Sequence, residues 1–229
     1  MKEEKSKPVL AGELLLVIGV FLDAMGIVFM LYSGAGMTAG ASVSYALFLA
    51  FPALTQGTWM YLFQGALVMI LFLVGRKLNW SYLFSFVVGF FFGIAVDFHK
   101  MWIETLPTGF AFRVAYFLLG FAAVSFSVAL MNRCLLPIIP ADLFSREMSR
   151  ILQVPYMRVR LPQDITCLSV TLFLTVVFTG RPQGIGVGTV IAAFTLGKAI
   201  AWFGERMDRR FTTRLVWLRG SKKGNAESA

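Results

Sequence analysis

An aspartate stands in the middle of an apolar stretch near the N-terminus. The stretch Leu14–Tyr32 reads LLLVIGVFLDAMGIVFMLY, and Asp23 is its only charged residue. Gly19 and Gly26 lie four residues before it and three residues after it, so the three share one helix face. Small residues mark faces where membrane helices approach closely. An acid within a membrane is a candidate for function. We expect Asp23 to line a solute pathway. The alternative is a hydrogen bond that holds a neighbouring helix.

The composition indicates what surrounds this helix. Hydrophobic residues make up 58% of the chain and charged residues only 14%, whereas about a quarter of a soluble domain is charged. A helix that crosses a bilayer needs roughly 20 apolar residues. The long apolar segments are Leu10–Tyr32, Met60–Val74, Ser81–Phe98, Phe110–Met131, Asp164–Thr179 and Ile185–Phe203. We therefore predict an all-α polytopic membrane protein with six transmembrane helices.

Two further segments are too short or too charged to cross. Ala41–Leu54 is interrupted by Pro52, and Ala141–Gln153 carries four charges. With both as short non-spanning or re-entrant helices, most basic residues fall on one side together with both termini. Basic residues concentrate on the cytoplasmic side, so we expect cytoplasmic termini in a bacterial inner membrane.

Each half of the chain has the same order of elements, namely a span, a short helix and two more spans. Because each half has three spans, the halves would be inverted relative to each other. In this alignment Gly19 corresponds to Gly120, and Gly93 corresponds to Gly197. The predicted organisation is a cytoplasmic segment 1–9, a first repeat 10–98, an external loop 99–109, a second repeat 110–203 and a basic tail 204–229.

The basic tail carries much of the net charge of +9. If it is helical, Phe211, Leu215 and Leu218 share one face, with arginines around them and Trp217 beside them. This pattern is typical of an interfacial helix on anionic lipid. We expect the partner of the tail to be the lipid bilayer and not nucleic acid.

Two glycine-rich stretches precede predicted helices. GAGMTAGAS spans residues 34–42, and GIGVGT spans residues 184–189. Neither has the strand and helix context of a nucleotide-binding loop. The N-terminus of a half-helix offers free N–H groups, so Thr38, Ser42 and Ser44 are candidates for contact with a polar or anionic solute. The glycines expected to allow close packing are Gly19, Gly26, Gly36, Gly40, Gly89, Gly93, Gly186 and Gly188.

Asp97 and Lys198 are charged residues at or within predicted spans. Asp97 follows Gly89 and Gly93 on one helix face, at the outer end of its span. It either pairs with a neighbouring cation or serves as an external gate or coupling carboxylate. Lys198 either extends its long stem to the membrane surface or points inward and pairs with Asp23 or Asp164.

The remaining charged candidates lie before the fifth span. Asp164 follows Arg160 and Pro162. These two charged residues either form an Arg–Asp pair that holds an inner gate, or serve as a basic anchor and an acid in the first helical turn. Asp142 either caps its short helix or lines the pathway.

The segments PADLFSREMSRILQVPYMRVRLPQD and TGRPQGIGVGTVIAAFTLGKAIAWF together resemble the YczE/YitT-like family of bacterial integral membrane proteins. The matching positions are Pro140, Asp142 and Leu143, then Val159, Arg160 and Asp164, then Gly186, Gly188 and Thr189, with GTWMYLFQG (57–65) and Asp97 in the first half. The chain departs from the family pattern at MTAGAS, which lacks an acidic residue, and after Asp142, where the usual glycine is absent. The resemblance implies a membrane protein, loosely described as a transport protein.

Together these features predict a transporter or channel for a small polar or anionic solute, with its site at the interface of the two repeats. The alternative is a non-transporting accessory membrane protein that supports biogenesis or another complex. One histidine and two separated cysteines form no transition-metal motif, and no catalytic constellation is present. We therefore expect no enzyme activity, no cofactor and no metal. The expected partners are lipid and the unidentified solute, and a homodimer is left open.

Overall fold

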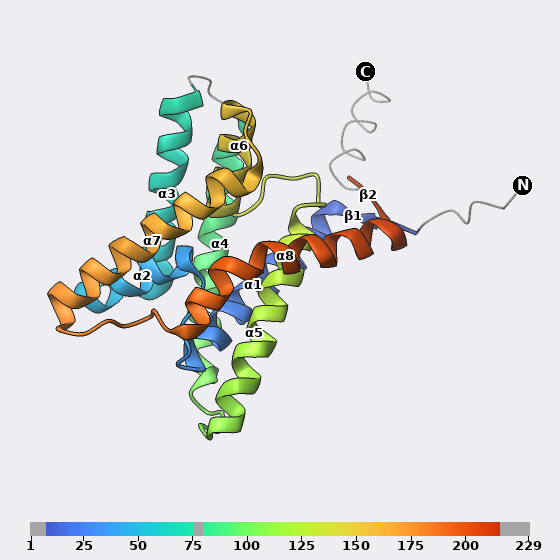
Figure 1. The fold of residues 1–229 in the computed structure, drawn as a ribbon. Helices are drawn as coiled ribbons and strands as arrows, with labels where there is room; N and C mark the ends of the chain where they lie inside the picture. The colour runs from blue at the N-terminus through green and yellow to red at the C-terminus, as the bar shows by residue number, and fades with distance from the viewer. Residues whose placement is uncertain (1–7, 76–79, 216–229) are drawn as a thin grey trace, which may run out of the picture.

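The computed structural model describes residues 8–75 and 80–215, which form eight α-helices and two short strands (Figure 1). The elements in chain order are β1 (Val9–Ala11), α1 (Gly12–Tyr32), α2 (Ala39–Ala50), α3 (Gln56–Gly75), α4 (Trp80–Ile103), α5 (Phe110–Met131), α6 (Pro140–Leu152), α7 (Tyr156–Thr179), α8 (Val187–Arg210) and β2 (Thr212–Arg214).

Six of the described helices are long and apolar enough to cross a membrane, namely α1, α3, α4, α5, α7 and α8. The chain is therefore an all-α polytopic membrane protein, as the composition predicted. The helices α2 and α6 have 12 and 13 residues. At 1.5 Å per residue each is roughly 20 Å long, which is less than the hydrocarbon core of about 30 Å.

Four spanning helices are longer than the apolar segments that predicted them, and α3 begins at Gln56 instead of Met60. Helix α4 continues to Ile103 and α8 continues to Arg210. Helix α7 begins at Tyr156 and passes through Pro162. Membrane helices tolerate an internal proline where nearby groups satisfy the freed backbone. Arg160 and Asp164 therefore lie one turn apart on one helix instead of in a loop.

The beginning of the basic tail differs from its prediction. We expected a helix through Phe211 and Leu215, but Thr212–Arg214 forms strand β2, which pairs in parallel with β1 (Figure 1). The backbone N–H of Thr212 donates to the carbonyl of Pro8 at 3.1 Å. The β-branched residues Thr212 and Thr213 favour extended backbone. Trp217 and Leu218 lie outside the described residues.

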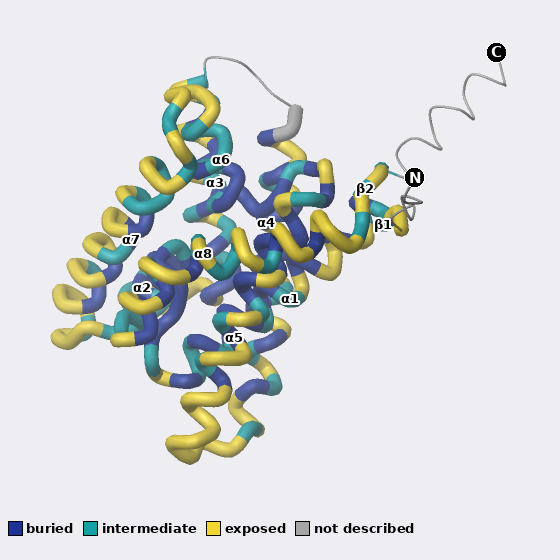
Figure 2. The backbone as a smooth tube through the Cα atoms, turned by 45° about the vertical axis from the view of Figure 1, so that its right-hand side comes forward, coloured by how far each residue is buried: buried dark blue, intermediate teal, exposed yellow. Residues whose placement is uncertain are grey.

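Helix α1 lies at the centre and packs against α4 and α5. It crosses α5 at two glycines. A Cβ on Gly26 would lie 2.8 Å from the carbonyl oxygen of Gly120, and a Cβ on Gly120 would lie 2.6 Å from that of Gly26. Figure 2 shows that burial concentrates around α1, whereas the outer face of α7 is exposed. Because lipid surrounds a membrane protein, the exposed apolar side chains on the outer face of α7 would contact lipid instead of water.

Each of the two short helices packs against a long helix from the other half of the chain. Helix α2 packs along α7, and α6 packs against α3. One hydroxyl pair joins α2 to α7, since the oxygens of Ser42 and Thr171 lie 2.9 Å apart. Each short helix therefore contacts a long helix of the other half, and this exchange closes the centre of the molecule.

Candidate functional site

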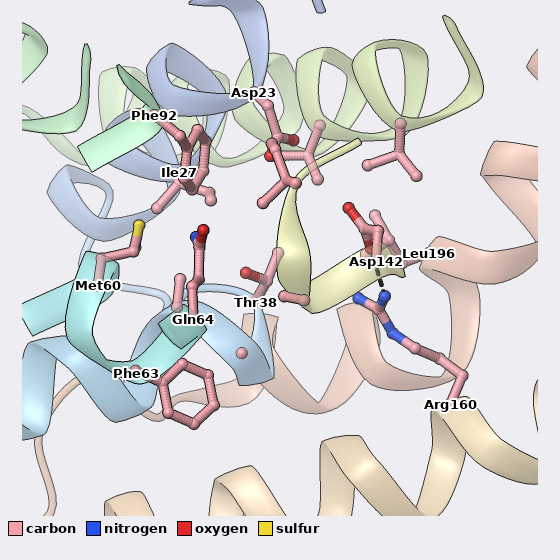
Figure 3. Close-up of a pocket in the computed structure, with 16 residues that line it drawn as sticks. Asp23, Ile27, Thr38, Met60, Phe63, Gln64, Phe92, Asp142, Arg160 and Leu196 are labelled. Atoms are coloured by element: carbon pink, nitrogen blue, oxygen red, sulfur yellow. Dashed lines mark hydrogen bonds and ion pairs between the residues drawn. The ribbon is translucent and has the colours of Figure 1, made fainter. Parts of the chain in front are cut away.

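A polar cavity of about 50 Å³ lies where the two halves meet (Figure 3). Each of the eight described helices, or the residue just before it, contributes to its wall. Apolar side chains form most of the lining. The polar lining groups are Asp23, Thr38, Gln64, Asp142 and Arg160. One water occupies roughly 10–15 Å³ on this measure, so the cavity has room for a few waters or one small ion.

The N-terminal ends of both short helices line this cavity. Thr38, Gly40 and Ala41 lie at the beginning of α2, while Ala141 and Asp142 lie at the beginning of α6. Helix N-termini carry partial positive charge and free N–H groups. The carboxylate of Asp142 sits in the first turn of α6, where this partial charge stabilises it.

Arg160 on α7 joins two carboxylates at one side of the cavity. Its Nη1 donates to Asp142 Oδ1 at 2.5 Å, and its Nε donates to Asp164 Oδ2 at 3.2 Å. The Tyr156 hydroxyl accepts a further hydrogen bond at 3.3 Å. The three charged side chains are only 8–14% exposed. The arginine thus pairs with both carboxylates, and the predicted Arg–Asp pair is a three-residue network that includes Asp142.

Asp164 also lines a second cavity of about 10 Å³ between α7 and α8. Arg160 and Leu196 line both cavities. The ion-pair network therefore lies between the central cavity and the space between α7 and α8.

Asp23 forms the expected hydrogen bond to a neighbouring helix and also borders the central cavity. It is 4% exposed and lines the central cavity. It also accepts a hydrogen bond from Ser127 Oγ on α5 at 2.8 Å. One side of the carboxylate therefore holds the α1–α5 contact while the residue borders the cavity.

Gln64 is a lining residue that the sequence analysis did not select. It is 2% exposed, and its Oε1 has no hydrogen-bond donor. A Cβ on Gly89 would overlap this oxygen, so the glycine on α4 leaves room for the amide. A signal was present in the sequence, because Gln64 is an amide in an apolar span and lies seven residues after Gly57 on the same helix face.

The two glycine-rich stretches lie against each other. The N–H of Gly188 donates to the carbonyl of Ala35 at 2.9 Å. A Cβ on Gly36 would overlap Thr189, and a Cβ on Gly186 would overlap Ala35. The stretches therefore bring the beginnings of α2 and α8 together. Their role in this structure is close backbone packing.

The packing glycines of the spans also behave as expected. Gly19 faces Met131, Gly89 faces Gln64, and Gly93 faces Gly57. Gly40 differs, because a Cβ there would meet nothing within 4 Å. It lines the central cavity, so we correct its role from packing to lining.

Asp97 lies outside the central cavity and binds the N-terminus of a helix. It accepts hydrogen bonds from Thr55 Oγ1 at 2.6 Å and from the N–H of Gly57 at 2.9 Å. These donors lie at the beginning of α3, where the first N–H groups have no partner within the helix. A carboxylate supplied by α4 thus binds the N-terminus of α3 beside its N-cap residue Thr55, a role that the sequence did not indicate.

Three other predicted residues also lie away from the cavity lining. Ser44 Oγ donates to the carbonyl of Ala41 at 2.7 Å, and Ser42 bonds Thr171. Lys198 is exposed on α8, and no ion pair of the described residues includes it. Its position matches the alternative in which the lysine extends along the helix surface.

The fold and the cavity define a polytopic helical membrane protein with a buried polar site between two halves. The chain belongs to the family of unknown function DUF6198, whose family model matches residues 10–205. Neither a curated protein nor a solved structure matches the chain. Among the described residues, no group of three or more His, Cys, Asp or Glu side chains could hold a metal ion.

Proposed function

We propose that the protein is a transporter for a small polar solute in the bacterial inner membrane, with its solute site in the central cavity. The observation that carries this proposal is the central cavity with five polar lining side chains, to which every described helix contributes. Ionisable groups buried in a membrane protein are costly, so their presence usually marks a functional site. The resemblance to the YczE/YitT-like family supports the same class.

An inverted repeat is part of the proposal. Helices α1 to α4 and α5 to α8 share the order long, short, long, long. Helix α1 packs on α4, and α5 packs on α8. The glycine crossing of α1 and α5 lies where the halves meet. Transporters with inverted repeats bind solute between the halves, often at the ends of short or broken helices. With three spans in each half, both termini lie on one side, which the basic residues indicate is the cytoplasm.

The charges of the cavity favour a neutral polar solute over an anion. Asp142 and Asp164 already pair with Arg160, and their negative charges would repel an anion that approached the guanidinium. A neutral solute needs only the polar side chains and the N–H groups at the beginnings of α2 and α6. The volume of about 50 Å³ describes a closed form, so passage requires the halves to separate. The ion pairs of Arg160 with Asp142 and Asp164 stabilise the closed form.

Gly40 gives a direct test of passage through the cavity. A Cβ there would meet nothing within 4 Å, and Gly40 lines the cavity, so we expect Gly40→Leu to place its side chain in the cavity. Replacing a helical glycine also stabilises a helix by roughly 0.5–1 kcal/mol. We expect unchanged or higher detergent melting temperature and a loss of uptake in proteoliposomes, measured with a panel of neutral, zwitterionic, cationic and anionic solutes.

The matched control is Ala111→Leu, which adds similar bulk at an exposed position in the first turn of α5. It should leave uptake unchanged. If Gly40→Leu transports like the natural chain, the solute does not pass through this cavity. If the natural chain transports no solute of the panel and copurifies with a fixed partner protein, the accessory role replaces the transporter.

A further inference from the structure

Asp23 has no positive partner in the central cavity. Asp142 and Asp164 both pair with Arg160, whereas no ion pair of the described residues includes Asp23. The Asp23 side chain is buried in the middle of the spanning helix α1. An ionised carboxylate in such surroundings is costly, and the group usually takes up a proton instead. The position of Asp23 therefore favours the neutral acid.

The charged groups around Asp23 act in the same direction. Figure 3 shows Asp142 between Asp23 and Arg160. An ionised Asp23 is repelled by Asp142 on α6 more strongly than it is attracted by Arg160 on α7. The other lining residues of the cavity, from α2, α3, α4, α5 and α8 among others, carry no charge. His99 on α4 contacts Phe21, which lies about 200° around the α1 axis from Asp23.

The hydroxyl of Ser127 indicates where the proton of Asp23 would lie. Ser127 Oγ lies 2.8 Å from Asp23 Oδ1 and 2.9 Å from the carbonyl oxygen of Val124. A hydroxyl has one proton to donate, and a carbonyl oxygen has none. With Asp23 ionised, Ser127 therefore satisfies only one of these two acceptors at a time. With Asp23 protonated on Oδ1, the acid donates to Ser127 and Ser127 donates to Val124, so both contacts are hydrogen bonds.

We propose that Asp23 is the proton-binding group of the protein and that it is protonated in the closed form. The proton lies on Oδ1 in the contact with Ser127 and leaves a neutral carboxyl beside the cavity. When the cavity opens to water, the proton passes from Oδ1 to a water molecule. Ser127 then turns its hydroxyl from Val124 to the carboxylate, which water also hydrates.

This inference rests on the proposed function, because the proton would be the ion that couples to solute transport. A proton on Asp23 takes up none of the cavity volume of about 50 Å³. The closed form can therefore hold the proton and a small solute together. Buried acids serve as proton carriers in membrane transporters. The expected coupling is symport, in which proton and solute cross the membrane in the same direction.

The first test is infrared difference spectroscopy of the purified full-length protein. A protonated carboxyl has a C=O stretching band that a carboxylate lacks. At neutral pH the natural chain should show this band, and Asp23→Asn should lose it. Ser127→Ala should keep the band at a shifted frequency, because the acid loses its hydrogen-bond acceptor, and this shift assigns the band without the Asp23→Asn variant. The control Glu104→Gln, at an exposed carboxyl outside the cavity, should leave the band unchanged.

Thermal melting gives a second readout of the same proton. The folded protein holds a proton on Asp23 that the unfolded chain releases, so the melting temperature of the natural chain should fall as the pH rises. Asp23→Asn should show a smaller fall over the same pH range, because an amide does not titrate. Glu104→Gln should follow the natural chain.

The coupling is tested by uptake into proteoliposomes with an inward proton gradient, using the solute panel of the Gly40→Leu experiment. The natural chain should accumulate its solute above the external concentration. In Asp23→Asn the gradient should no longer raise uptake above the rate measured without a gradient, because the amide cannot release a proton.

Two outcomes would overturn the proton site. They are an unchanged carboxyl band in a folded Asp23→Asn variant, or an equal pH dependence of melting in this variant and the natural chain. Uptake that Gly40→Leu blocks but that a proton gradient does not drive would refute the coupling and leave the proposed function intact. A carboxyl band that Asp23→Asn removes, without uptake of any solute, would support the proton site and refute the transporter.

Discussion

The helix pairs α3–α4 and α7–α8 are packed in different ways. In α3–α4, a Cβ on Gly93 would lie 2.6 Å from the backbone oxygen of Gly57. The rings of Tyr61 and Phe86 lie 4.4 Å apart in the same pair. Helices α7 and α8 instead enclose the small cavity beside Arg160. Close backbone contact restricts the relative movement of two helices, whereas a gap between them leaves room for side chains to rearrange.

The polar contacts of the two helix pairs also differ. The first half uses its carboxylate Asp97 to bind a helix N-terminus within the α3–α4 pair. The second half places Asp142, Arg160 and Asp164 in one buried network beside the cavity. The comparison suggests that α3–α4 is the rigid support and that α7 carries the part that moves.

The largest effect should come from Arg160→Gln. Removing one member of a buried ion pair costs about 3–5 kcal/mol, because the remaining charges lose their partner. Asp142 and Asp164 would then face each other uncompensated. We expect a large fall in detergent melting temperature and in the yield of monodisperse protein, measured by scanning fluorimetry and size-exclusion chromatography.

A matched variant is Arg133→Gln, which removes the pair with Asp208. That pair is bidentate, with both distances at 2.6 Å, but its side chains are 23% and 61% exposed. Exposed pairs contribute about 0–1 kcal/mol, so this variant should melt nearly like the natural chain. Equal falls in melting temperature for the two variants would contradict the larger stabilising effect that we expect from the buried ion pairs of Arg160.

An intermediate effect should separate Gly93→Ala from Gly197→Ala. The new Cβ at position 93 meets the backbone of Gly57, which cannot yield. At position 197 it meets the flexible side chain of Met157, whose sulfur lies 3.1 Å away. Overpacking costs typically 1–3 kcal/mol, so Gly93→Ala should lower the melting temperature. Gly197→Ala should be neutral or slightly stabilising, because alanine favours the helix. The reverse order would make α7–α8 the rigid pair.

The smallest effect concerns the hydroxyl pair between α2 and α7. Ser42→Ala and Thr171→Val each remove one partner of the 2.9 Å contact. Interhelical hydrogen bonds in membranes average about 0.6 kcal/mol. A double-mutant cycle in thermal unfolding should return a coupling energy near this value. A coupling energy of several kcal/mol would show that this hydroxyl pair holds α2 firmly against α7. The second half of the chain would then contain a rigid contact as well.

The sequence by itself determined the class of the protein and the position of its spans. Length and hydrophobicity of a helix are local properties, so six spans and two short helices follow from composition along the chain. The face of Asp23 also follows locally, because Gly19 and Gly26 share it. The sequence shows that Arg160 and Asp164 are four residues apart. It did not show that both lie on one helix, because Pro162 between them favoured a helix boundary at that point.

The tertiary structure decided which distant groups meet. Asp97 binds the N-terminus of a helix that begins 41 residues earlier in the chain, at Gln56. The two glycine-rich stretches touch each other, and Gln64 borders the same cavity as Asp23. Phe211 leaves the expected helix because the strand that pairs with Thr212–Arg214 lies at the opposite end of the chain. Local periodicity carries no information about such contacts, since each depends on how helices cross.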